Sequence, residues 1–398
     1  MSRFANSNRR NVLKSIGGLA VGGALAGCTG GNNGSNSGGD GGSSSSGGSS
    51  SGGSSSGGSS GGNSTPTSTP KPSYNAKMGI VSTEMNQVPS LAALRQMLPK
   101  DTDNRMQGSF RTFDSSSLPM QALVGGSIDY YALSFGNVVQ AALAGTELVV
   151  IGTKNKGTDY AWVINTKKCP DVKSVKDLVD KGHTIGIAGL GGLSHTQVAG
   201  VLGKEGLPTD PDKANIVSVG GSSARTSAVA SGKVDSTVIH IDQYRQLKEQ
   251  GAPVDTLFQL KKYFPNFVGQ TFTVRKSFLE NAKTKAHAQA YIQVAVEADK
   301  LATENFDWLF KKVQEIQAKP LSKDSAKTAW KLNADTLKTW PYTKDAYTKE
   351  SYKNYVDAQK AANILTDKQA SQIDYDKLLN FDLWNSAVDN MDAQRWLD

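Results

Sequence analysis

The chain has 398 residues, of which 37% are apolar and 20% are charged, and its formal net charge is +8. Residues 1–27 contain four basic residues and no acid, so the rest of the chain carries +4 without a basic run. This charge does not indicate a nucleic-acid-binding protein. Cys28 and Cys169 are the only two cysteines, which excludes a disulfide framework.

The first 27 residues show the order of elements expected of an export signal. Residues 8–14 contain paired arginines, and residues 15–27 form an apolar stretch that is too short to span a bilayer. The arginine pair resembles a twin-arginine signal, and Leu-Ala-Gly before Cys28 resembles a lipoprotein cleavage box. We therefore expect cleavage before Cys28 and a lipid on its thiol, and Cys169 is then a small packing residue without a disulfide partner.

Residues 28–73 consist almost entirely of Gly, Ser, Asn, Thr and Pro. Such a segment cannot bury enough apolar surface to fold, so it is predicted to be a disordered tether. The folded body then begins at residue 74, and its length of about 325 residues suggests two domains.

The folded body begins with alternating strands and helices. Leu91, Leu94 and Leu98 have helical spacing between two strand-like stretches. The predicted strands are 78–81, 127–133, 148–151, 184–188, 216–219, 236–239 and 268–274, and the predicted helices are 138–144, 194–204 and 223–231. This alternation predicts parallel α/β lobes, and the apolar stripe that includes Tyr291 and Val294 predicts a helical C-terminal part.

One local pattern occurs twice. Residues 121–129 and 227–235 each run from an apolar helix end through Gly126 or Gly232 into an aliphatic residue and Asp. Glycine at this point supplies the left-handed conformation that ends a helix. The repeat predicts two lobes of one design, although any helix-to-strand connection can produce the pattern once.

Five local motifs together resemble one protein family. They are Ala122–Asp129 with Ser134-Phe135-Gly136-Asn137, Ser174–Leu178, Gly192-Leu193-Ser194-His195, Ala224-Arg225 with Gly232–Asp235, and Phe264-Pro265 with Phe272–Val274. The chain over residues 75–320 resembles the ABC-transporter periplasmic solute-binding proteins for nitrate, sulfonates, taurine and thiamine precursors. The resemblance implies a two-lobe, type II-like α/β fold with crossing strands near 160–165 and 268–274. Lobe 1 would comprise 74–165 and 263–398, and lobe 2 would comprise 166–262.

Ligands of open α/β sheets bind at the carboxyl ends of the strands, so the loops there are the candidate site. The loop at 189–196 contains Gly192, Ser194 and His195, and its backbone N–H groups at a helix N-terminus favour an anion. The alternative is that Ser194 acts only as a helix N-cap.

Arg225 lies in the first turn of a predicted helix, where the helix dipole does not favour a cation. Such an arginine either pairs with a local acid or directs its fork to a carboxylate or sulfonate of a ligand. The other candidate ligand-binding residues follow or lie on strands, where helix-turn, hinge or packing roles are the alternatives. They are Ser82, Thr83, Ser134, Phe135, His240 and Gln270.

These features predict an exported, lipid-anchored solute-binding protein that captures a small sulfonate, nitrate or carboxylate by lobe closure. Its expected partners are an ABC permease and its ATPase, and we expect a monomer without a cofactor. No metal is expected, since the four histidines show no metal-ligand spacing. One alternative is an enzyme on the same fold that acts on a pyrimidine-like or anionic substrate through His195 or His240. The other is a structural surface lipoprotein.

Overall fold

The computed structural model describes residues 73–115, 117–264 and 267–397. The export signal, Cys28 and nearly all of the tether lie outside these residues and remain predictions. Within the described ranges, no helix combines the length and apolar character needed to cross a membrane.

The first sheet has the strand order β2-β1-β3-β10-β4. β1 runs parallel to β2 and β3, whereas β10 runs antiparallel to β3 and β4. The strands are β1 (Tyr74–Ile80), β2 (Met106–Thr112), β3 (Tyr130–Tyr131), β4 (Leu148–Lys156) and β10 (Val268–Arg275). Leu91, Leu94 and Leu98 are fully buried beside this sheet, as their helical spacing predicts. The helices of this part are η1 (Met85–Gln87), α2 (Val88–Ala92), η2 (Ala93–Met97), α3 (Leu98–Asp101), α4 (Ser117–Val124) and α5 (Phe135–Leu143).

The second sheet has the order β7-β6-β8-β5-β9. β6 runs parallel to β7 and β8, and β5 runs antiparallel to β8 and β9. Its strands are β5 (Tyr160–Asn165), β6 (Ile185–Ile187), β7 (Ile216–Ser218), β8 (Ser236–His240) and β9 (Val254–Gln259). Its helices are α6 (Val175–Asp180), α7 (Leu193–Lys204), α8 (Ser222–Ser231), α9 (Ile241–Glu249) and η3 (Leu260–Lys262).

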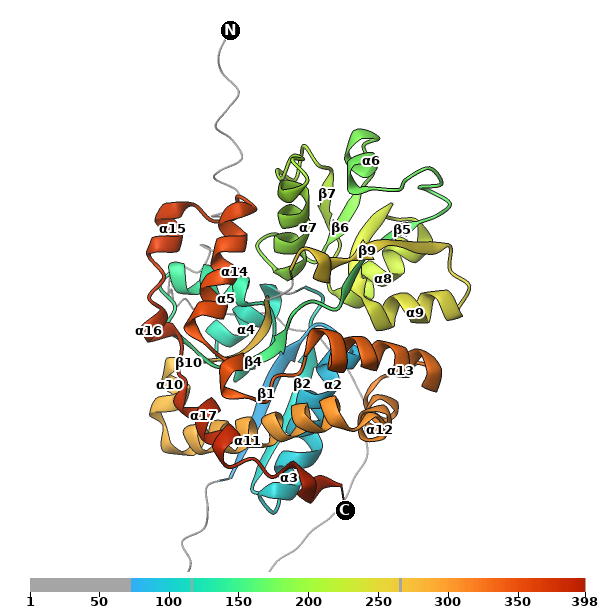
Figure 1. Ribbon diagram of the computed structural model, residues 1–398. Coiled ribbons are helices and arrows are strands. Elements are labelled where there is room, and N and C mark those ends of the chain that lie inside the picture. The colour runs from blue at the N-terminus through green and yellow to red at the C-terminus, as the bar shows by residue number, and fades with distance from the viewer. Residues whose placement is uncertain (1–72, 116, 265–266, 398) are drawn as a thin grey trace, which may run out of the picture. The chain divides into compact units, whose positions relative to one another are not determined.

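The two sheets therefore share one plan, in which the fourth strand in the order is antiparallel and is supplied by a crossing segment (Figure 1). The fold is a two-lobe α/β fold with a helical C-terminal region, as predicted. The chain passes from the first sheet to the second between Lys156 and Tyr160. The lobe boundary predicted from the sequence placed residues 160–165 at the end of lobe 1. These residues form β5, which belongs to the second sheet because it pairs there with β8 and β9.

The repeated helix-to-strand pattern has the same geometry in both lobes. Gly126 and Gly232 have φ values of 77° and 74°, in the left-handed region that ends a helix without strain for glycine. The aspartates that follow, Asp129 and Asp235, each accept a hydrogen bond of 2.8 Å from a backbone N–H, that of Lys77 in β1 and that of Thr184 directly before β6.

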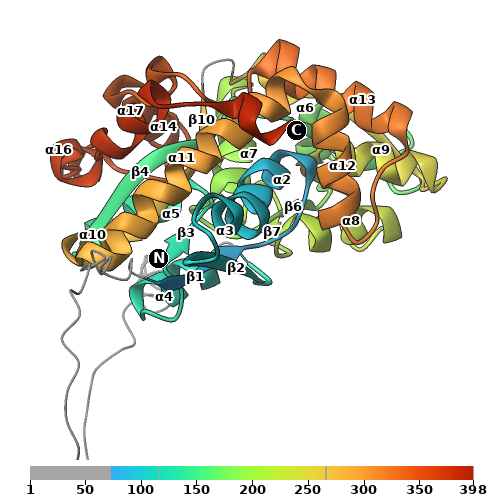
Figure 2. The same ribbon diagram turned by 90° about the horizontal axis from the view of Figure 1, so that it is seen from below.

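The C-terminal region contacts both lobes. The long helix α11 buries its apolar stripe, which includes Tyr291, and packs against α2 and α17 (Figure 2). α13 packs against α9 of the second lobe, while α14 packs against both α5 and α7 (Figure 1). The helices of this region are α10 (Lys276–Glu280), α11 (Ala282–Glu304), α12 (Phe306–Ile316), α13 (Lys323–Lys331), η4 (Leu332–Leu337), η5 (Lys344–Ala346), α14 (Lys349–Ala361), α15 (Asp367–Ser371), α16 (Tyr375–Leu378), α17 (Asp382–Asp389) and η6 (Ala393–Trp396).

Candidate functional site

The carboxyl ends of the parallel strands of both sheets meet where the lobes face each other. Backbone N–H groups donate two of the hydrogen bonds that cross this interface. The N–H of Gly221 donates to the carbonyl of Asp114 over 2.8 Å, and the N–H of Met85 donates to Asp242 Oδ2 over 2.7 Å. The lobes are therefore in contact at the position where ligands of open α/β sheets bind.

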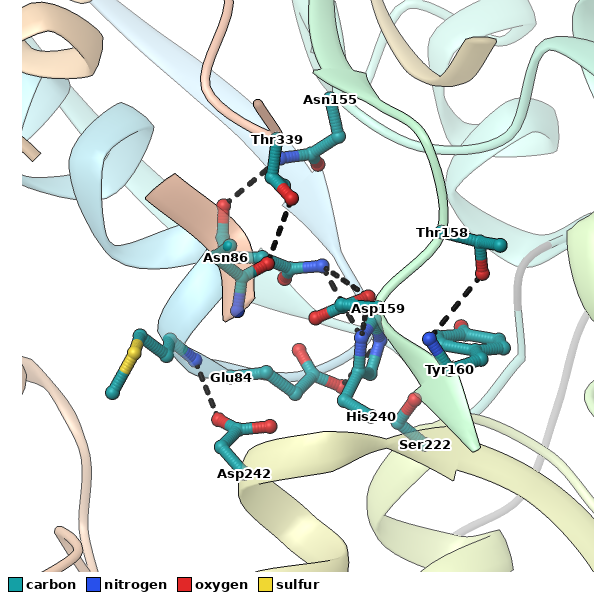
Figure 3. Close-up of polar contacts among 12 residues, drawn as sticks. Glu84, Asn86, Asn155, Thr158, Asp159, Tyr160, Ser222, His240, Asp242 and Thr339 are labelled. Carbon is teal, nitrogen blue, oxygen red and sulfur yellow. Dashed lines mark hydrogen bonds and ion pairs between the residues drawn. The ribbon is translucent and has the colours of Figure 1, made fainter. Parts of the chain in front are cut away.

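A carboxylate–histidine cluster, made of Glu84, Asp159, His240 and Asp242, lies at this interface (Figure 3). Glu84 comes from the loop after β1, Asp159 precedes β5, and the other two residues follow from the end of β8 into α9. His240 Nδ1 lies 2.8 Å from Asp159 Oδ1, and its Nε2 lies 3.6 Å from Glu84 Oε1. All four side chains are buried, so these charges interact with little screening by water.

Burial and charge act in opposite directions in this cluster. Burial acts to lower the pKa of His240, but the carboxylates of Asp159 and Glu84 outweigh it and raise the pKa to about 10. Burial raises the pKa of Asp242 to about 6, against the charge of His240 and the Met85 N–H, which lower it. At neutral pH, His240 is therefore an imidazolium that can donate from both ring nitrogens.

A small internal cavity lies beside the cluster. It is lined by His240, Asp159 and Tyr160 from the second lobe and by Asn86, Asn155 and Gln270, among others, from the first. Its free volume is about 10 Å³, which is room for about one water molecule. The two lobes are thus closed on each other around the cavity.

A larger groove of about 430 Å³ opens next to the cavity. Ser82, Thr83 and Glu84 line it from the first lobe, and Asp242 and Gln243 line it from the second. Glu84 Oε2 and Gln243 Oε1 are buried acceptors without a hydrogen-bond partner among the described residues. A buried acceptor without a donor costs free energy, and both of these residues belong to the lining of the groove.

The fold and the family are found in other proteins. The family model described as NMT1/THI5 like matches residues 114–304. This part of the chain is NMT1/THI5-like. The resemblance that the sequence motifs predicted is thereby confirmed. No curated protein sequence matches the chain.

Solved structures that are similar to this chain have the periplasmic-binding-protein fold. The nitrate-binding protein NrtA from Synechocystis superposes with a TM-score of 0.63 at 14% identity, over 80% of this chain and 89% of NrtA. The alkanesulfonate-binding protein SsuA from Xanthomonas axonopodis pv. citri, bound to MOPS, gives 0.59 at 19% identity, over 75% and 96%. The ligand-binding component of an ABC-type import system from Staphylococcus aureus gives 0.63 at 12% identity, over 79% and 98%.

Gln270 lines the cavity and belongs to a polar network of the first lobe. Its Oε1 accepts hydrogen bonds from Gln87 Nε2 over 2.9 Å and from Lys154 Nζ over 2.8 Å. Lys154 is buried, and loss of hydration lowers its pKa to about 7, although the acids Glu84, Asp299 and Asp159 act to raise it. The network holds Gln270 in place at the floor of the cavity.

Arg225 lies behind Tyr160 in the NMT1/THI5-like segment. Its Nη2 donates to Ser222 Oγ over 3.0 Å and to Tyr160 Oη over 3.4 Å, and its guanidinium lies 5.6 Å from the centre of the Tyr160 ring. The Tyr160 ring in turn meets His240 edge-on at 4.1 Å. No acid among the described residues forms an ion pair with Arg225, its Nε has no partner there, and it lines neither the cavity nor the groove.

Two backbone N–H groups in and directly before the glycine-rich loop donate to side chains of α7. Ser194 Oγ accepts a hydrogen bond of 2.8 Å from the N–H of Ala188, and His195 Nδ1 accepts one of 3.0 Å from Gly191. The N-cap of α7 is Gly192, so Ser194 does not cap this helix. Burial lowers the pKa of His195 to about 4, which leaves a neutral ring whose Nε2 has no partner among the described residues.

Ser134 and Phe135 have the helix-turn and packing roles that were the alternative to ligand contact. Ser134 Oγ caps α5 by accepting from the N–H of Gly136 over 3.2 Å, and it lies 3.0 Å from Tyr355 Oη. The Phe135 ring is fully buried and packs edge-on against Tyr352 and Tyr355 of α14. Neither residue lines the cavity or the groove.

Of the ten predicted site residues, the structure thus brings His240 and Gln270 to the cavity, and Ser82 and Thr83 to the groove. The other six contact protein groups. The prediction did not include Asn86, Asn155 or Asp159, which line the cavity. The direction of β5 could have revealed Asp159, because the amino end of an antiparallel strand lies at the carboxyl ends of its neighbours.

Proposed function

We propose that the chain is the exported substrate-binding component of an ABC importer and captures a small solute between its lobes. The observation that carries this proposal is the meeting of buried polar side chains from both lobes, centred on Glu84, Asn86, Asp159 and His240, at the carboxyl ends of the strands. The likeness in fold to nitrate-binding and alkanesulfonate-binding proteins and to an ABC import component supports it.

Lobe closure is the mechanism that this arrangement supports. A solute that contacts both lobes favours the closed state, because only that state provides both sets of contacts. The hydrogen bonds from the Met85 N–H to Asp242 and from Asn86 Nδ2 to Asp159 hold the lobes together. A solute larger than one water molecule replaces some of these contacts with its own.

The proposed solute is a small anion of the sulfonate, nitrate or carboxylate type. A sulfonate or carboxylate can also carry a hydrogen-bond donor such as an amino or hydroxyl group. The likeness in fold to the nitrate-binding and alkanesulfonate-binding proteins supports an anionic group. The unpartnered acceptors Glu84 Oε2 and Gln243 Oε1, beside Asp242, support a donor on the same solute.

An enzyme on the same fold is the second candidate, and one observation favours it. His240 and Asp159 form a titratable pair within hydrogen-bond reach, at 2.8 Å, beside the cavity. A general base works best when its pKa lies near the working pH. Because the pKa of His240 is raised to about 10, the imidazolium holds its proton at neutral pH, and we favour binding over catalysis.

The test is a thermal-shift screen of the full chain against small anions, aminosulfonates and pyrimidines, followed by calorimetry. A solute present at one hundred times its Kd stabilises the folded state by about 2.7 kcal/mol, which the screen detects as a higher Tm. Stoichiometric binding without turnover supports the proposal. Conversion of the solute supports the enzyme, and the absence of any shift supports the structural lipoprotein.

We propose further that the mature protein starts at Cys28 and is held by its lipid on the outer side of a membrane. Cells fed with a clickable fatty acid provide the test. The wild-type chain is expected to incorporate the label, and Cys28→Ser is expected to lose it, while Cys169→Ser serves as the matched control. Equal labelling of wild type and Cys28→Ser contradicts the anchor but leaves solute capture intact.

A further inference from the structure

Three side chains that commonly bind transition metals lie together at the end of the second sheet opposite the interface between the lobes. Cys169 follows β5, His183 precedes β6, and Asp235 precedes β8. β6, β8 and β5 are neighbours in the sheet, and β5 runs antiparallel to the other two. The carboxyl end of β5 therefore meets the amino ends of β6 and β8, which brings the three residues together.

The distances between these side chains are those of ligands around one metal ion. Cys169 Sγ lies 3.7 Å from His183 Nδ1, which lies 3.4 Å from Asp235 Oδ2, and all three atoms lie within 4.8 Å of one another. A tetrahedral zinc site with bonds of about 2.0–2.3 Å has ligand-to-ligand distances of about 3.4–3.6 Å. Small side-chain shifts suffice to form the site.

The arrangement differs from a catalytic relay. In a Cys-His-Asp relay, the thiol and the carboxylate approach opposite nitrogens of the imidazole. Here Cys169 and Asp235 both approach Nδ1 of His183. Three groups that converge on one point are suited to binding an ion rather than to passing a proton along a chain.

Neighbouring groups hold the carboxylate in position. Asp235 Oδ2 accepts hydrogen bonds from the N–H and the hydroxyl of Thr184, over 2.8 and 2.9 Å. Partial burial acts to raise the pKa of Asp235, but these hydrogen bonds and His183 lower it, so the group is a carboxylate at neutral pH. Groups that orient a metal ligand in this way strengthen metal binding.

The cluster is accessible from solvent on one side. The side chains of His183 and Asp235 are 19% and 21% exposed, whereas Cys169 is 2% exposed. An ion can therefore reach the cluster past the imidazole and the carboxylate, with the thiol behind it. A water molecule can complete the tetrahedron on the exposed side.

We propose that Cys169, His183 and Asp235 bind one Zn²⁺ ion, or a chemically similar ion such as Co²⁺. A thiolate and an imidazole favour these ions over Mg²⁺ and Ca²⁺, which prefer oxygen ligands. The site ties the segment after β5 to the starts of β6 and β8, and it does not depend on the proposed solute. The thiol proton passes to the solvent when the Cys169 thiolate binds the ion.

The test uses the full chain with Cys28→Ser, so that Cys169 is the only thiol, under reducing conditions. Titration with Co²⁺ is expected to produce a thiolate-to-cobalt charge-transfer band that saturates at one ion per chain and disappears when Zn²⁺ is added. Cys169→Ser is expected to lose the band and at least about 100-fold in Zn²⁺ affinity, and His183→Asn at least about tenfold. Asp171→Asn removes an exposed carboxylate two residues from Cys169 and is expected to change neither.

Two outcomes overturn the proposal. One is a Co²⁺ complex without the charge-transfer band, and the other is Zn²⁺ binding of equal affinity in all four proteins. If the circular dichroism spectrum shows that Cys169→Ser does not fold, the Zn²⁺ affinity of His183→Asn decides between the outcomes. The His183 side chain is partly exposed, so this variant is expected to fold. As an independent measurement, Zn²⁺ is expected to slow alkylation of Cys169 in the folded chain, and an unchanged alkylation rate contradicts the site.

Discussion

The two lobes use an aspartate at the same structural position in different ways. Asp129 accepts from the backbone N–H of Lys77 over 2.8 Å and from Tyr74 Oη over 2.9 Å, and Arg275 Nη2 lies 3.9 Å away. Asp235 also accepts from a neighbouring backbone N–H over 2.8 Å, but a thiol and an imidazole face it instead of a guanidinium. The fold requires the aspartate, and the side chains around it decide what chemistry is possible there.

The histidines of the second lobe show a parallel contrast between the two ends of its sheet. His240 lies at the interface between the lobes, 2% exposed and enclosed by Asp159 and Glu84. His183 lies at the opposite end, partly exposed, with Asp235 as its partner. Water screens the pair of His183 and Asp235 but not the pair of His240 and Asp159. We therefore expect the two pairs to contribute very differently to the free energy of unfolding.

The largest expected effect follows from removing the inner histidine. His240→Ala leaves Asp159 and Glu84 as buried charges without a cation between them. Breaking a buried pair from one side costs about 3–5 kcal/mol. We expect the free energy of unfolding in urea to fall by that amount, and a loss below about 1 kcal/mol contradicts the burial of this charge cluster.

The same histidine predicts a pH dependence of stability. Its pKa rises from 6.5 to about 10 on folding, so the stabilisation is complete below pH 6.5 and is lost as the pH rises to about 10. Folding also raises the pKa of Asp242, from 3.8 to about 6, so its contribution to stability likewise falls as the pH rises, between pH 3.8 and about 6. We expect the difference in Tm between wild type and His240→Asn to shrink from pH 6.5 to 10, and a constant difference contradicts the assignment.

The paired aspartates allow a test of their shared backbone role. Asp129→Ala leaves the Lys77 N–H and the Tyr74 hydroxyl without their acceptor and removes the carboxylate next to Arg275, which keeps its hydrogen bonds to the carbonyls of Leu123 and Ile128. Hydrogen bonds to charged groups contribute about 1.5–3 kcal/mol each, and solvent exposure weakens these two, so we expect a total loss of about 2 kcal/mol in urea unfolding. Asp235→Ala in metal-free buffer is the matched variant, and an unequal loss there argues against an equivalent role.

Much of the fold could be predicted because the signals are local. The helical spacing of Leu91, Leu94 and Leu98 and the glycines at 126 and 232 predict elements that the structure contains. The strand β2 was missed because it lies at the sheet edge with alternating exposure, and its Gln, Gly, Ser and Arg give no apolar run.

The site was harder to predict because it depends on contacts between distant segments. Asn86 and Asp159 approach His240 from different lobes, and no spacing in the sequence reveals this. The cluster proposed to bind a metal could not be predicted for the same reason, since Cys169, His183 and Asp235 show no ligand spacing and meet only through the strand order. Phe135 shows the opposite error. It follows a strand, where ligand-binding residues are expected, but Tyr352 and Tyr355 of α14 pack against its ring.

Arg225 tests whether the second lobe supplies a charge to the solute. Once a binding solute is known, Arg225→Ala is expected to weaken its affinity by at least about 1.5 kcal/mol, the low end for hydrogen bonds to charged groups. Calorimetry gives the value, with the exposed Lys233→Ala, beyond the other end of α8, as control. Unchanged affinity removes Arg225 from the site and leaves it as the support of Tyr160.

The smallest effect is expected at the outer histidine and completes the contrast with His240. In metal-free buffer, His183→Ala is expected to change the free energy of unfolding by less than about 1 kcal/mol, because its pair with Asp235 is partly exposed and Thr184 still holds the carboxylate. Saturating Zn²⁺ is then expected to raise the Tm of wild type and not of this variant. A large loss without metal would show instead that the imidazole itself stabilises this end of the sheet, as His240 does at the other.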